Sequence, residues 1–321
     1  MLKASVIGVG HLGKIHARLL KENHHFQLAG VYDILPDKAQ KFATEIECHV
    51  FENLQEAVAQ ADVVIIVTPT ASHCEIATYA MQQGKHVFIE KPVTLHRDEI
   101  NALVACQNHS RVKVQVGHVE RFNPAFLIVQ HQINQPRFIE THRLAQFNPR
   151  GTDVSVVLDL MVHDLDIVYA IVQSKVKNIL ANAVAIVSDT PDIANARIEF
   201  ENGCVANLTA SRISLKNMRK TRVFQSDAYI SIDFLNKKSE VIKIDSNVDE
   251  SNPFALILDL HEKGKRQITI KQPKLDAINS IVYEHQLFKN AITENKEPVI
   301  GLQQAKEVME IAFGVMEKCS Q

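Results

Sequence analysis

The fold of this chain of 321 residues is decided by Val6-Ile7-Gly8-Val9-Gly10-His11-Leu12-Gly13. The stretch completes a G-x-G-x-x-G pattern between the apolar run Ala4–Ile7 and a helical pattern over Lys14–Lys21. The first glycine permits a tight turn, the second lets backbone approach a pyrophosphate, and the third allows the helix to pack closely on the strand. Strand, turn and helix therefore predict a dinucleotide site in which all six residues from Gly8 to Gly13 contact the cofactor: Gly8, Val9, Gly10, His11, Leu12 and Gly13.

Asp33 ends a second apolar run, Gln27–Tyr32, about 20 residues beyond the glycine pattern. A carboxylate at this place accepts hydrogen bonds from ribose hydroxyls and repels a 2′-phosphate, so we expect NAD rather than NADP. Lys38 can partly offset this repulsion by pairing with a 2′-phosphate, so the preference for NAD over NADP is moderate. The alternative is that Asp33 caps the helix predicted over 37–46, a role for which Asp37 is better placed.

Composition limits the class of protein and of partner. With 46% hydrophobic and 22% charged residues and a net charge of −2, the chain lacks the basic surface that nucleic acid or an anionic membrane requires. Five cysteines without a C-x-x-C pair suit a reducing cytoplasm and argue against structural zinc. The fold starts close to Met1, which leaves no room for a signal peptide, and no apolar run approaches a membrane span. We expect a cytoplasmic protein.

The chain is long enough for two domains. Over residues 1–120, apolar strands alternate with helical patterns, and runs such as Val63–Val67 indicate strands covered on both faces. This pattern predicts an α/β fold, a doubly wound parallel Rossmann sheet. Strands are expected at 3–8, 27–33, 63–68, 86–90 and 112–117, and helices at 12–22, 37–46, 54–59, 73–83 and 97–108.

Residues 121–321 have a different pattern and are expected to form an α+β domain. Long alternating segments and the hairpin signal Glu201-Asn202-Gly203 predict a mostly antiparallel sheet with one face packed on helices. Segment 245–254 is polar and is expected to be a loop. The helices are predicted at 124–133, 153–172, 276–294 and 302–318.

Two segments follow predicted strands at the edge where a doubly wound sheet binds its ligand. Thr68-Pro69-Thr70-Ala71-Ser72-His73 would bring Thr68 and His73 to the cofactor, or is simply a turn in which Ser72 caps a helix. Glu90-Lys91-Pro92 follows the next strand, and Pro92 restricts Lys91 to extended geometry. The lysine ammonium would stabilise a developing alkoxide near the nicotinamide, unless it is an ordinary surface lysine.

Asp159 and His163 lie four residues apart, on one face of a predicted helix. Histidine is the usual proton acceptor near neutral pH when an alcohol is oxidised, and a carboxylate one turn away orients it. A structural Asp–His pair is the alternative. Asp166 would complete a metal site with them, but a single histidine without an H-E-x-x-H pattern makes metal the weaker interpretation, and we expect none.

Together these motifs resemble the Gfo/Idh/MocA family of oxidoreductases, over nearly the whole chain. The resemblance implies that Lys91 and His163 are the catalytic pair, with Asp159 beside them. It assigns the cofactor site, besides the glycine turn and Asp33, to Thr68, Pro69, His73, Glu90 and Lys91. It further implies that the second domain is an open-faced sheet whose exposed face forms homodimers or homotetramers.

The runs 116–125 and 159–166 resemble the branch of this family that acts on nucleotide sugars. This implies oxidation of the 3-hydroxyl of UDP-N-acetylglucosamine to a ketone, with Arg121, Asn123 and Arg150 as candidates for substrate phosphates or hydroxyls. Thr70 and Glu120 depart from the broad family pattern. Three alternatives stay open: a dehydrogenase of inositol or a free sugar, a glycosidase that retains NAD, and a non-catalytic NAD-binding regulator.

Overall fold

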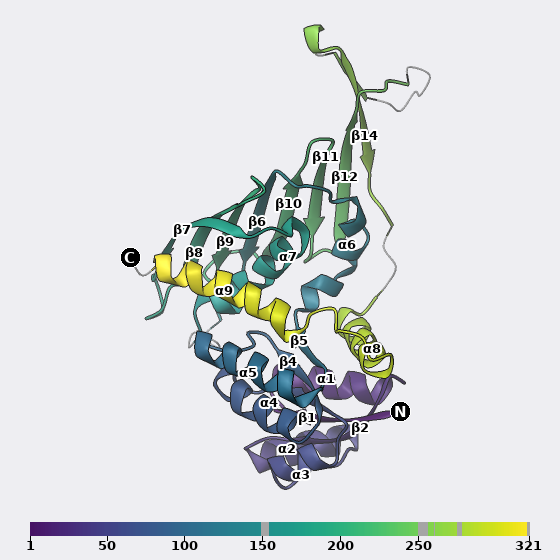
Figure 1. The fold of residues 1–321 in the computed structure, drawn as a ribbon, viewed down its shortest axis with the longest axis vertical. Coiled ribbons are helices and arrows are strands. Elements are labelled where there is room, and N and C mark those ends of the chain that lie inside the picture. The colour runs from purple at the N-terminus through teal and green to yellow at the C-terminus, as the bar shows by residue number, and fades with distance from the viewer. Residues whose placement is uncertain (149–153, 250–255, 260, 275–277, 320–321) are drawn as a thin grey trace. The chain divides into compact units, whose positions relative to one another are not determined.

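A computed structural model describes residues 1–148, 154–249, 256–259, 261–274 and 278–319 (Figure 1). The chain divides into two compact units. The first comprises Met1–Phe122 and Ile278–Glu310, and the second comprises Asn123–Ala277 and Ile311–Gln321. In the part of the chain that is described, no helix is both long enough and apolar enough to cross a membrane.

The first unit is built on a sheet of five parallel strands, as the sequence predicts. They are β1 (Leu2–Ile7), β2 (Phe26–Tyr32), β3 (Val63–Ile66), β4 (His86–Glu90) and β5 (Val114–Gly117), in the order β2-β1-β3-β4-β5. Val50 forms an isolated parallel bridge to Val31 outside β2. The strand order reverses between β1 and β3, which is where a doubly wound sheet opens its ligand crevice.

Helices connect these strands as expected: α1 (His11–Glu22), α2 (Pro36–Ile46), α3 (Leu54–Ala59), α4 (His73–Gln82) and α5 (Arg97–Ser110). The expected helix caps were partly wrong. Leu35 occupies the N-cap of α2 without a side-chain hydrogen bond, and Asp37 lies in its first turn. Ser72 does not cap α4, because its hydroxyl bonds to Thr68 and Pro69 in a short 3-10 turn, Thr70–Ser72.

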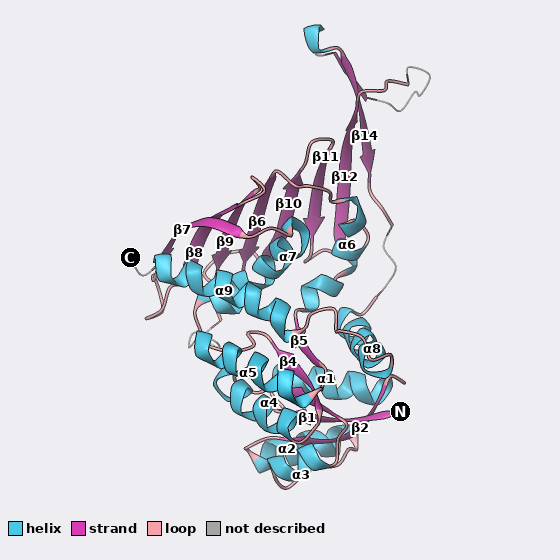
Figure 2. Cartoon of the chain, viewed as in Figure 1, coloured by secondary structure: helices cyan, strands magenta, loops and turns pink. Residues whose placement is uncertain are grey.

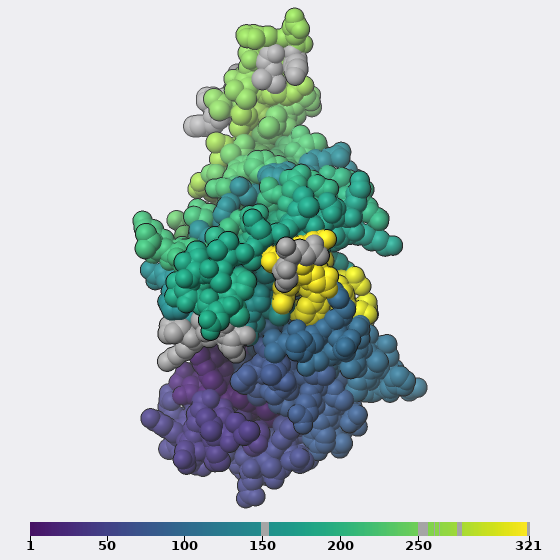
Figure 3. Space-filling view, turned by 90° about the vertical axis from the view of Figure 1, so that its left-hand side faces the viewer, coloured from purple at the N-terminus to yellow at the C-terminus, as the bar shows by residue number. Residues whose placement is uncertain are grey.

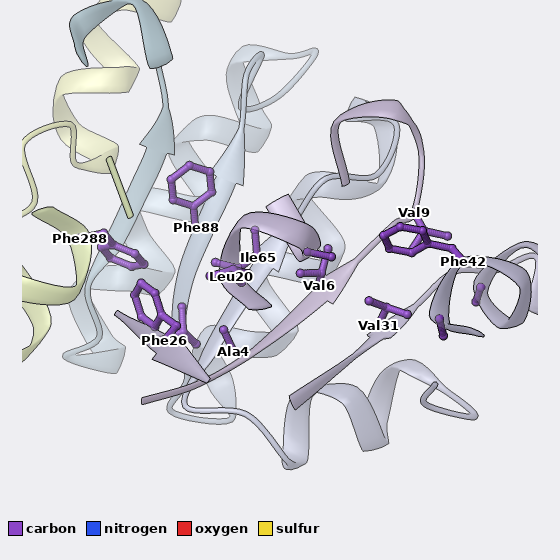
Figure 4. Packing of buried hydrophobic residues seen from close by; sticks show 14 residues of the cluster. Ala4, Val6, Val9, Leu20, Phe26, Val31, Phe42, Ile65, Phe88 and Phe288 are labelled. Atoms are coloured by element: carbon purple, nitrogen blue, oxygen red, sulfur yellow. The ribbon is translucent and has the colours of Figure 1, made fainter. Parts of the chain in front are cut away.

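The core of the first unit includes a helix from the far end of the chain. Phe288 on α8 (Ser280–Thr293) is fully buried and packs near Phe88 and Phe26 (Figure 4). The division at 120/121 therefore needs a correction, because residues 278–310 belong with the first unit. An amphipathic pattern predicts a helix but not the surface on which it packs.

The second unit contains a sheet of nine strands (Figure 2). All of its strand pairs are antiparallel except β6–β9, which is parallel. The order is β13-β14-β12-β11-β10-β6-β9-β8-β7. The strands are β6 (Phe138–Leu144), β7 (Val176–Val184), β8 (Ile193–Phe200), β9 (Val205–Ser211), β10 (Met218–Phe224), β11 (Ala228–Asp233), β12 (Lys238–Asp245), β13 (Leu256–Asp259) and β14 (Lys265–Lys271).

One face of this sheet is covered and the other is open. Burial alternates along β6, β8, β9 and β11, with buried residues on the face that contacts α6 (Pro124–Leu127) and α7 (Val162–Val172). The helix predicted over 124–133 begins at Pro124 as expected but is too long, because α6 ends at Leu127 and a 3-10 turn, Gln130–Gln132, follows. The helix predicted over 153–172 begins instead with a π turn, Val157–Met161, and continues as α7.

Strands β12, β14 and β13 extend beyond the rest of the sheet as a narrow arm (Figure 1), whose atoms are green at the top of Figure 3. Part of the predicted loop is strand, since β12 runs through Asp245. The last helix, α9 (Leu302–Cys319), spans the boundary of the two units, and the predicted helix over 276–294 begins at Ser280 in the described chain.

Candidate functional site

The glycine turn between β1 and α1 depends on two of its three glycines for its shape. Gly8 has φ +94°, and its amide donates to the Tyr32 carbonyl at 2.7 Å. A Cβ on Gly13 would stand 1.9 Å from the Gly8 carbonyl oxygen. Gly10 is different, because a Cβ there would meet nothing within 4 Å among the described residues. Its role is therefore to leave space in front of the turn.

That space lies at the N-terminus of α1. Gly10 is the N-cap residue and provides no side-chain hydrogen bond to the first amides of this helix of 12 residues. These amides carry the positive end of the helix dipole and are available to an anion. An uncapped helix start behind an open glycine position fits a dinucleotide pyrophosphate.

Asp33, at the end of β2, ties this turn to the neighbouring strand. Its Oδ2 accepts from the Val9 amide at 2.8 Å and from Lys38 Nζ at 3.1 Å, while Oδ1 accepts from the Leu35 amide at 3.1 Å. Burial raises the pKa of Asp33, but these hydrogen bonds outweigh it and hold the pKa below its usual value. A carboxylate has about four acceptor positions, so this anion retains capacity for a ribose hydroxyl. The turn and Asp33 together fit NAD.

His73 is placed as an internal brace. Its ring is 1% exposed, with Nε2 at 2.9 Å from the Thr68 carbonyl and Nδ1 at 3.1 Å from the Pro92 carbonyl. Burial lowers the pKa of His73, and a neutral imidazole carries one N–H, so the ring donates to one of these two carbonyls and packs against the other. The ring lies between the segment after β3 and the segment after β4, and its expected contact with the cofactor stays a prediction. Thr68 is half-buried and Pro69 is exposed at the same edge.

The Glu90-Lys91-Pro92 segment follows β4 at the carboxyl edge of the sheet. Glu90 is 7% exposed; its Oε1 lies 2.9 Å from His16 Nε2, and its Oε2 accepts the Lys91 amide at 3.1 Å. Lys91 is half-buried, and the Lys91–Pro92 peptide bond is cis. Glu90 is therefore buried and holds the backbone of this segment, whereas Lys91 is half-buried at the carboxyl edge of the sheet.

In the second unit, Asp159 lies within the π turn and His163 within the first turn of α7, and both are half-buried. The next residue, Asp164, makes a buried ion pair with Arg143 of β6 at 2.9 Å. This pair fixes α7, and with it His163, to the covered face of the sheet. Asp159, His163 and Asp166 do not form a three-ligand metal cluster within the described ranges.

The three residues expected to bind substrate have different positions. Arg121 lies in a 3-10 turn, Val119–Phe122, and its Nη2 is 2.9 Å from the side-chain oxygen of Gln304 in the orientation that satisfies both neighbours of that amide. Asn123 is 6% exposed, caps α6 through the Ala125 amide and donates to the Phe234 carbonyl, and its expected contact with the substrate stays a prediction. Arg150 lies outside the described residues.

Two residues near Glu90 were not predicted from the sequence. His16 on α1 and His285 on α8 are both fully buried, and their rings join at 2.9 Å between Nδ1 and Nε2. His16 lies three residues beyond Gly13, on the buried side of the helix, which is a usable signal. Nothing in the sequence near His285 links it to Glu90.

Comparison with known proteins gives two matching family models. An oxidoreductase family model with an NAD-binding Rossmann fold matches residues 2–118, and the C-terminal domain model of the GFO/IDH/MocA family matches residues 126–231.

Among curated proteins, UDP-N-acetylglucosamine 3-dehydrogenase of Acidithiobacillus ferrooxidans is 41% identical over 236 residues, which cover 73% of this chain and 75% of that protein. Its solved structure is similar with a TM-score of 0.88, at 33% identity over 99% of this chain and 97% of that one. Inositol 2-dehydrogenase of Rhizobium meliloti is 26% identical over 58% of this chain and 59% of its own length. A levoglucosan dehydrogenase complex with NADH and levoglucosan shares the fold, with a TM-score of 0.85 at 17% identity over 99% of this chain and 97% of that one.

The glycine turn, the anionic end of β2, the parallel first sheet and the open second sheet agree with these matches. The chain belongs to the Gfo/Idh/MocA family of NAD-binding oxidoreductases.

Proposed function

We propose that this protein oxidises the 3-hydroxyl of UDP-N-acetylglucosamine to a ketone with NAD as the oxidant. The observation that carries the proposal is the 41% sequence identity to UDP-N-acetylglucosamine 3-dehydrogenase of Acidithiobacillus ferrooxidans, together with structural similarity over 99% of the chain. The inositol dehydrogenase relative is less similar, at 26% identity over a shorter stretch. A nucleotide sugar is therefore favoured over a free polyol.

The proposed roles follow from the chemistry of each side chain. Bound NAD supplies the hydride acceptor. The ammonium of Lys91 donates a hydrogen bond to the substrate oxygen and stabilises its developing negative charge. His163 takes the hydroxyl proton, and Asp159 orients its imidazole. Arg121 offers a guanidinium for a substrate phosphate.

The test is to incubate the purified protein with NAD and a sugar panel while following the absorbance of reduced nicotinamide. The panel contains UDP-N-acetylglucosamine, UDP-glucose and myo-inositol. We expect reduction of NAD with UDP-N-acetylglucosamine, and reduction of the product with borodeuteride should place deuterium at sugar carbon 3. Turnover of myo-inositol without turnover of any nucleotide sugar would overturn the proposed substrate. Sugar release without net NADH would instead indicate a glycosidase, and NADH binding without any turnover a regulator.

We also propose that the open face of the second sheet joins copies of the chain into a homodimer or homotetramer. This face carries a mixture of charges and aromatic rings, such as Arg222 paired with Glu140 at 2.7 Å and Phe224 in contact with Tyr229 at 5.0 Å between ring centroids. Mixed polar and aromatic composition is typical of protein interfaces.

Light scattering on the eluting protein tests this proposal. Phe224→Glu places a charge on the open face and should reduce the measured mass to that of one chain. Val299→Glu, at an exposed position of the first unit, is the matched control and should leave the mass unchanged. A single-chain mass for the unsubstituted protein would refute self-association.

A further inference from the structure

Three ionisable side chains form a continuous buried row in the first unit. His16 lies between the other two, with Nε2 at 2.9 Å from Glu90 Oε1 and Nδ1 at 2.9 Å from His285 Nε2. His16 and His285 are 0% exposed and Glu90 is 7% exposed. The three residues come from α1, β4 and α8, which are far apart in the sequence.

Aromatic rings surround the two imidazoles. Phe88 lies 5.4 Å from the His16 ring and 5.8 Å from the His285 ring, and Phe26 meets His285 edge-on at 6.3 Å. Figure 4 shows Phe26, Phe88 and Phe288 gathered in this part of the core. Water therefore does not replace a lost hydrogen bond here, and each hydrogen bond of the row is stronger than it would be at the surface.

The row ends at Glu90. A carboxylate only accepts, so His16 donates to it from Nε2. His16 Nδ1 and His285 Nε2 share one hydrogen bond, in which one nitrogen donates and the other accepts. Burial lowers the pKa of His285 well below its ordinary value, which keeps that ring neutral. A chain of hydrogen bonds thus runs from α8 to Glu90.

Glu90 connects this chain of hydrogen bonds to the segment that carries Lys91. Its second oxygen, Oε2, accepts the Lys91 amide at 3.1 Å. Gly117 at the end of β5 packs against the same carboxylate, because a Cβ there would stand 2.7 Å from Oε1, the oxygen that His16 contacts. The orientation of the carboxylate therefore depends on His16 as well as on the end of β5.

We infer that His285 is a positioning residue for Lys91, acting through His16 and Glu90. The part of this inference that concerns turnover rests on the proposed function. His285 lies outside both stretches that the family models match, residues 2–118 and 126–231. Helix α8 thereby sets the geometry of a residue nearly two hundred positions earlier in the chain.

Three variants test this role. His285→Gln keeps an amide that hydrogen-bonds His16 Nδ1, His285→Met fills similar space without such a group, and Phe288→Leu disturbs the same core without touching the row. Misplacement of a reacting group by about 1 Å costs up to about a hundredfold in rate, so we expect His285→Met to lower kcat by at least about tenfold. The KM values for NAD and sugar should stay within about twofold, and His285→Gln should recover kcat to within about twofold of the unsubstituted enzyme. Phe288→Leu should lower the unfolding temperature yet keep its kcat.

A second measurement does not depend on the substrate. Amide hydrogen exchange at Lys91 reports its bond to Glu90, and it should accelerate in His285→Met but stay slow in His285→Gln and Phe288→Leu. An unchanged kcat and unchanged Lys91 exchange in His285→Met would overturn the inference, as would an equal effect in Phe288→Leu at equal loss of stability. If the unsubstituted protein fails to reduce NAD with UDP-N-acetylglucosamine, the proposed substrate is wrong, and the Lys91 exchange rates still decide the role of His285.

Discussion

Arg143 on β6 and Asp164 on α7 form a buried ion pair through two hydrogen bonds, 3.0 Å from Nε to Oδ2 and 2.9 Å from Nη2 to Oδ1. Both side chains are only 3% exposed. Two-point contact fixes the orientation of α7 on the sheet as well as its distance. Because His163 directly precedes Asp164, this pair also determines where the proposed proton acceptor stands.

Asp164→Asn should destabilise the second unit severely, because it leaves the Arg143 guanidinium buried beside a neutral amide. Removing one partner of a buried pair costs about 3–5 kcal/mol. Denaturant unfolding measures the change. The exposed pair Arg18–Glu45, at 2.5 Å, is the matched control, and Glu45→Gln should cost less than about 1 kcal/mol. An equal loss of unfolding free energy in Asp164→Asn and Glu45→Gln would show that burial does not strengthen the Arg143–Asp164 pair.

Alanine at Gly10 and at Gly13 should separate cofactor binding from stability. Gly13→Ala forces a Cβ against the Gly8 carbonyl and should lower the unfolding temperature by several degrees. Gly10→Ala meets no described atom, so the fold should keep its stability. Its methyl group enters the space proposed for the pyrophosphate, and NADH affinity should fall by at least about tenfold. Fluorescence titration of NADH and thermal unfolding check both halves; a Gly10→Ala protein with normal affinity would refute the proposed location.

Asp33→Ser should weaken the preference for NAD. The change removes the charge that repels a 2′-phosphate and releases Lys38, whose Nζ donates to Asp33 at 3.1 Å. We expect the ratio of kcat/KM for NAD to that for NADP to fall by at least about tenfold. The double variant Asp33→Ser with Lys38→Ala should lose the increase in kcat/KM for NADP. If the increase persists, Lys38 does not bind the 2′-phosphate.

Lys91→Met and His163→Asn should each lower kcat by about a hundredfold or more, the usual contribution of a positioned acid or base. NADH affinity should remain within about threefold, because the catalytic roles proposed for Lys91 and His163 concern the substrate oxygen and its proton. Stopped-flow and equilibrium titration measure the two quantities. Lys85→Met, in the loop before β4, is the control for loss of a lysine charge and should keep its activity. Normal turnover in either active-site variant would remove that residue from the proposed mechanism.

Asp192 should make the second unit sensitive to acid. Its Oδ2 accepts from the amides of Ile186, Val187 and Ser188 at 2.8, 2.6 and 3.0 Å. Burial raises the pKa of Asp192, but these donors outweigh it and hold the pKa far below 3.8. Since the folded pKa lies below the unfolded one, the stabilisation is present above about pH 3.8 and is lost as the pH falls below it.

Unfolding of the unsubstituted protein and of Asp192→Asn across pH 7 to pH 2 checks this prediction. At neutral pH the variant should be less stable by about 1–3 kcal/mol, since it replaces a charged acceptor by a neutral one. The two curves should converge in acid. A difference that stays constant with pH would show that the Asp192 charge is not responsible.

The sequence predicted the first sheet well because its signals are local. Val63–Ile66 and Val87–Ile89 are continuous apolar runs, and the bounds of β3 and β4 in the structure agree closely with the expected ones. Gly203, with φ +84°, turns the chain between β8 and β9 as the Asn-Gly signal predicts. In each case the residue that decides the conformation lies inside the element.

The errors arose where the deciding contact lies elsewhere in the chain. The segment 124–133 has a helical pattern, yet only Pro124–Leu127 is α-helix, and Asn123 caps it while binding the Phe234 carbonyl from another part of the unit. The π turn at Val157–Met161 replaces ordinary helix in a stretch whose apolar pattern has no feature of its own that demands it.

By itself, the sequence determined the dinucleotide turn, its anionic neighbour Asp33 and the two classes of sheet, because glycine geometry, strand alternation and charge act over a few residues. Only the tertiary structure decided that α8 joins the first unit, that His73 braces two backbone segments and that His285 meets His16 beside Glu90. These contacts link residues up to 269 positions apart. The pattern around either residue shows that it is buried, but the partner it meets there is set by how the whole unit packs.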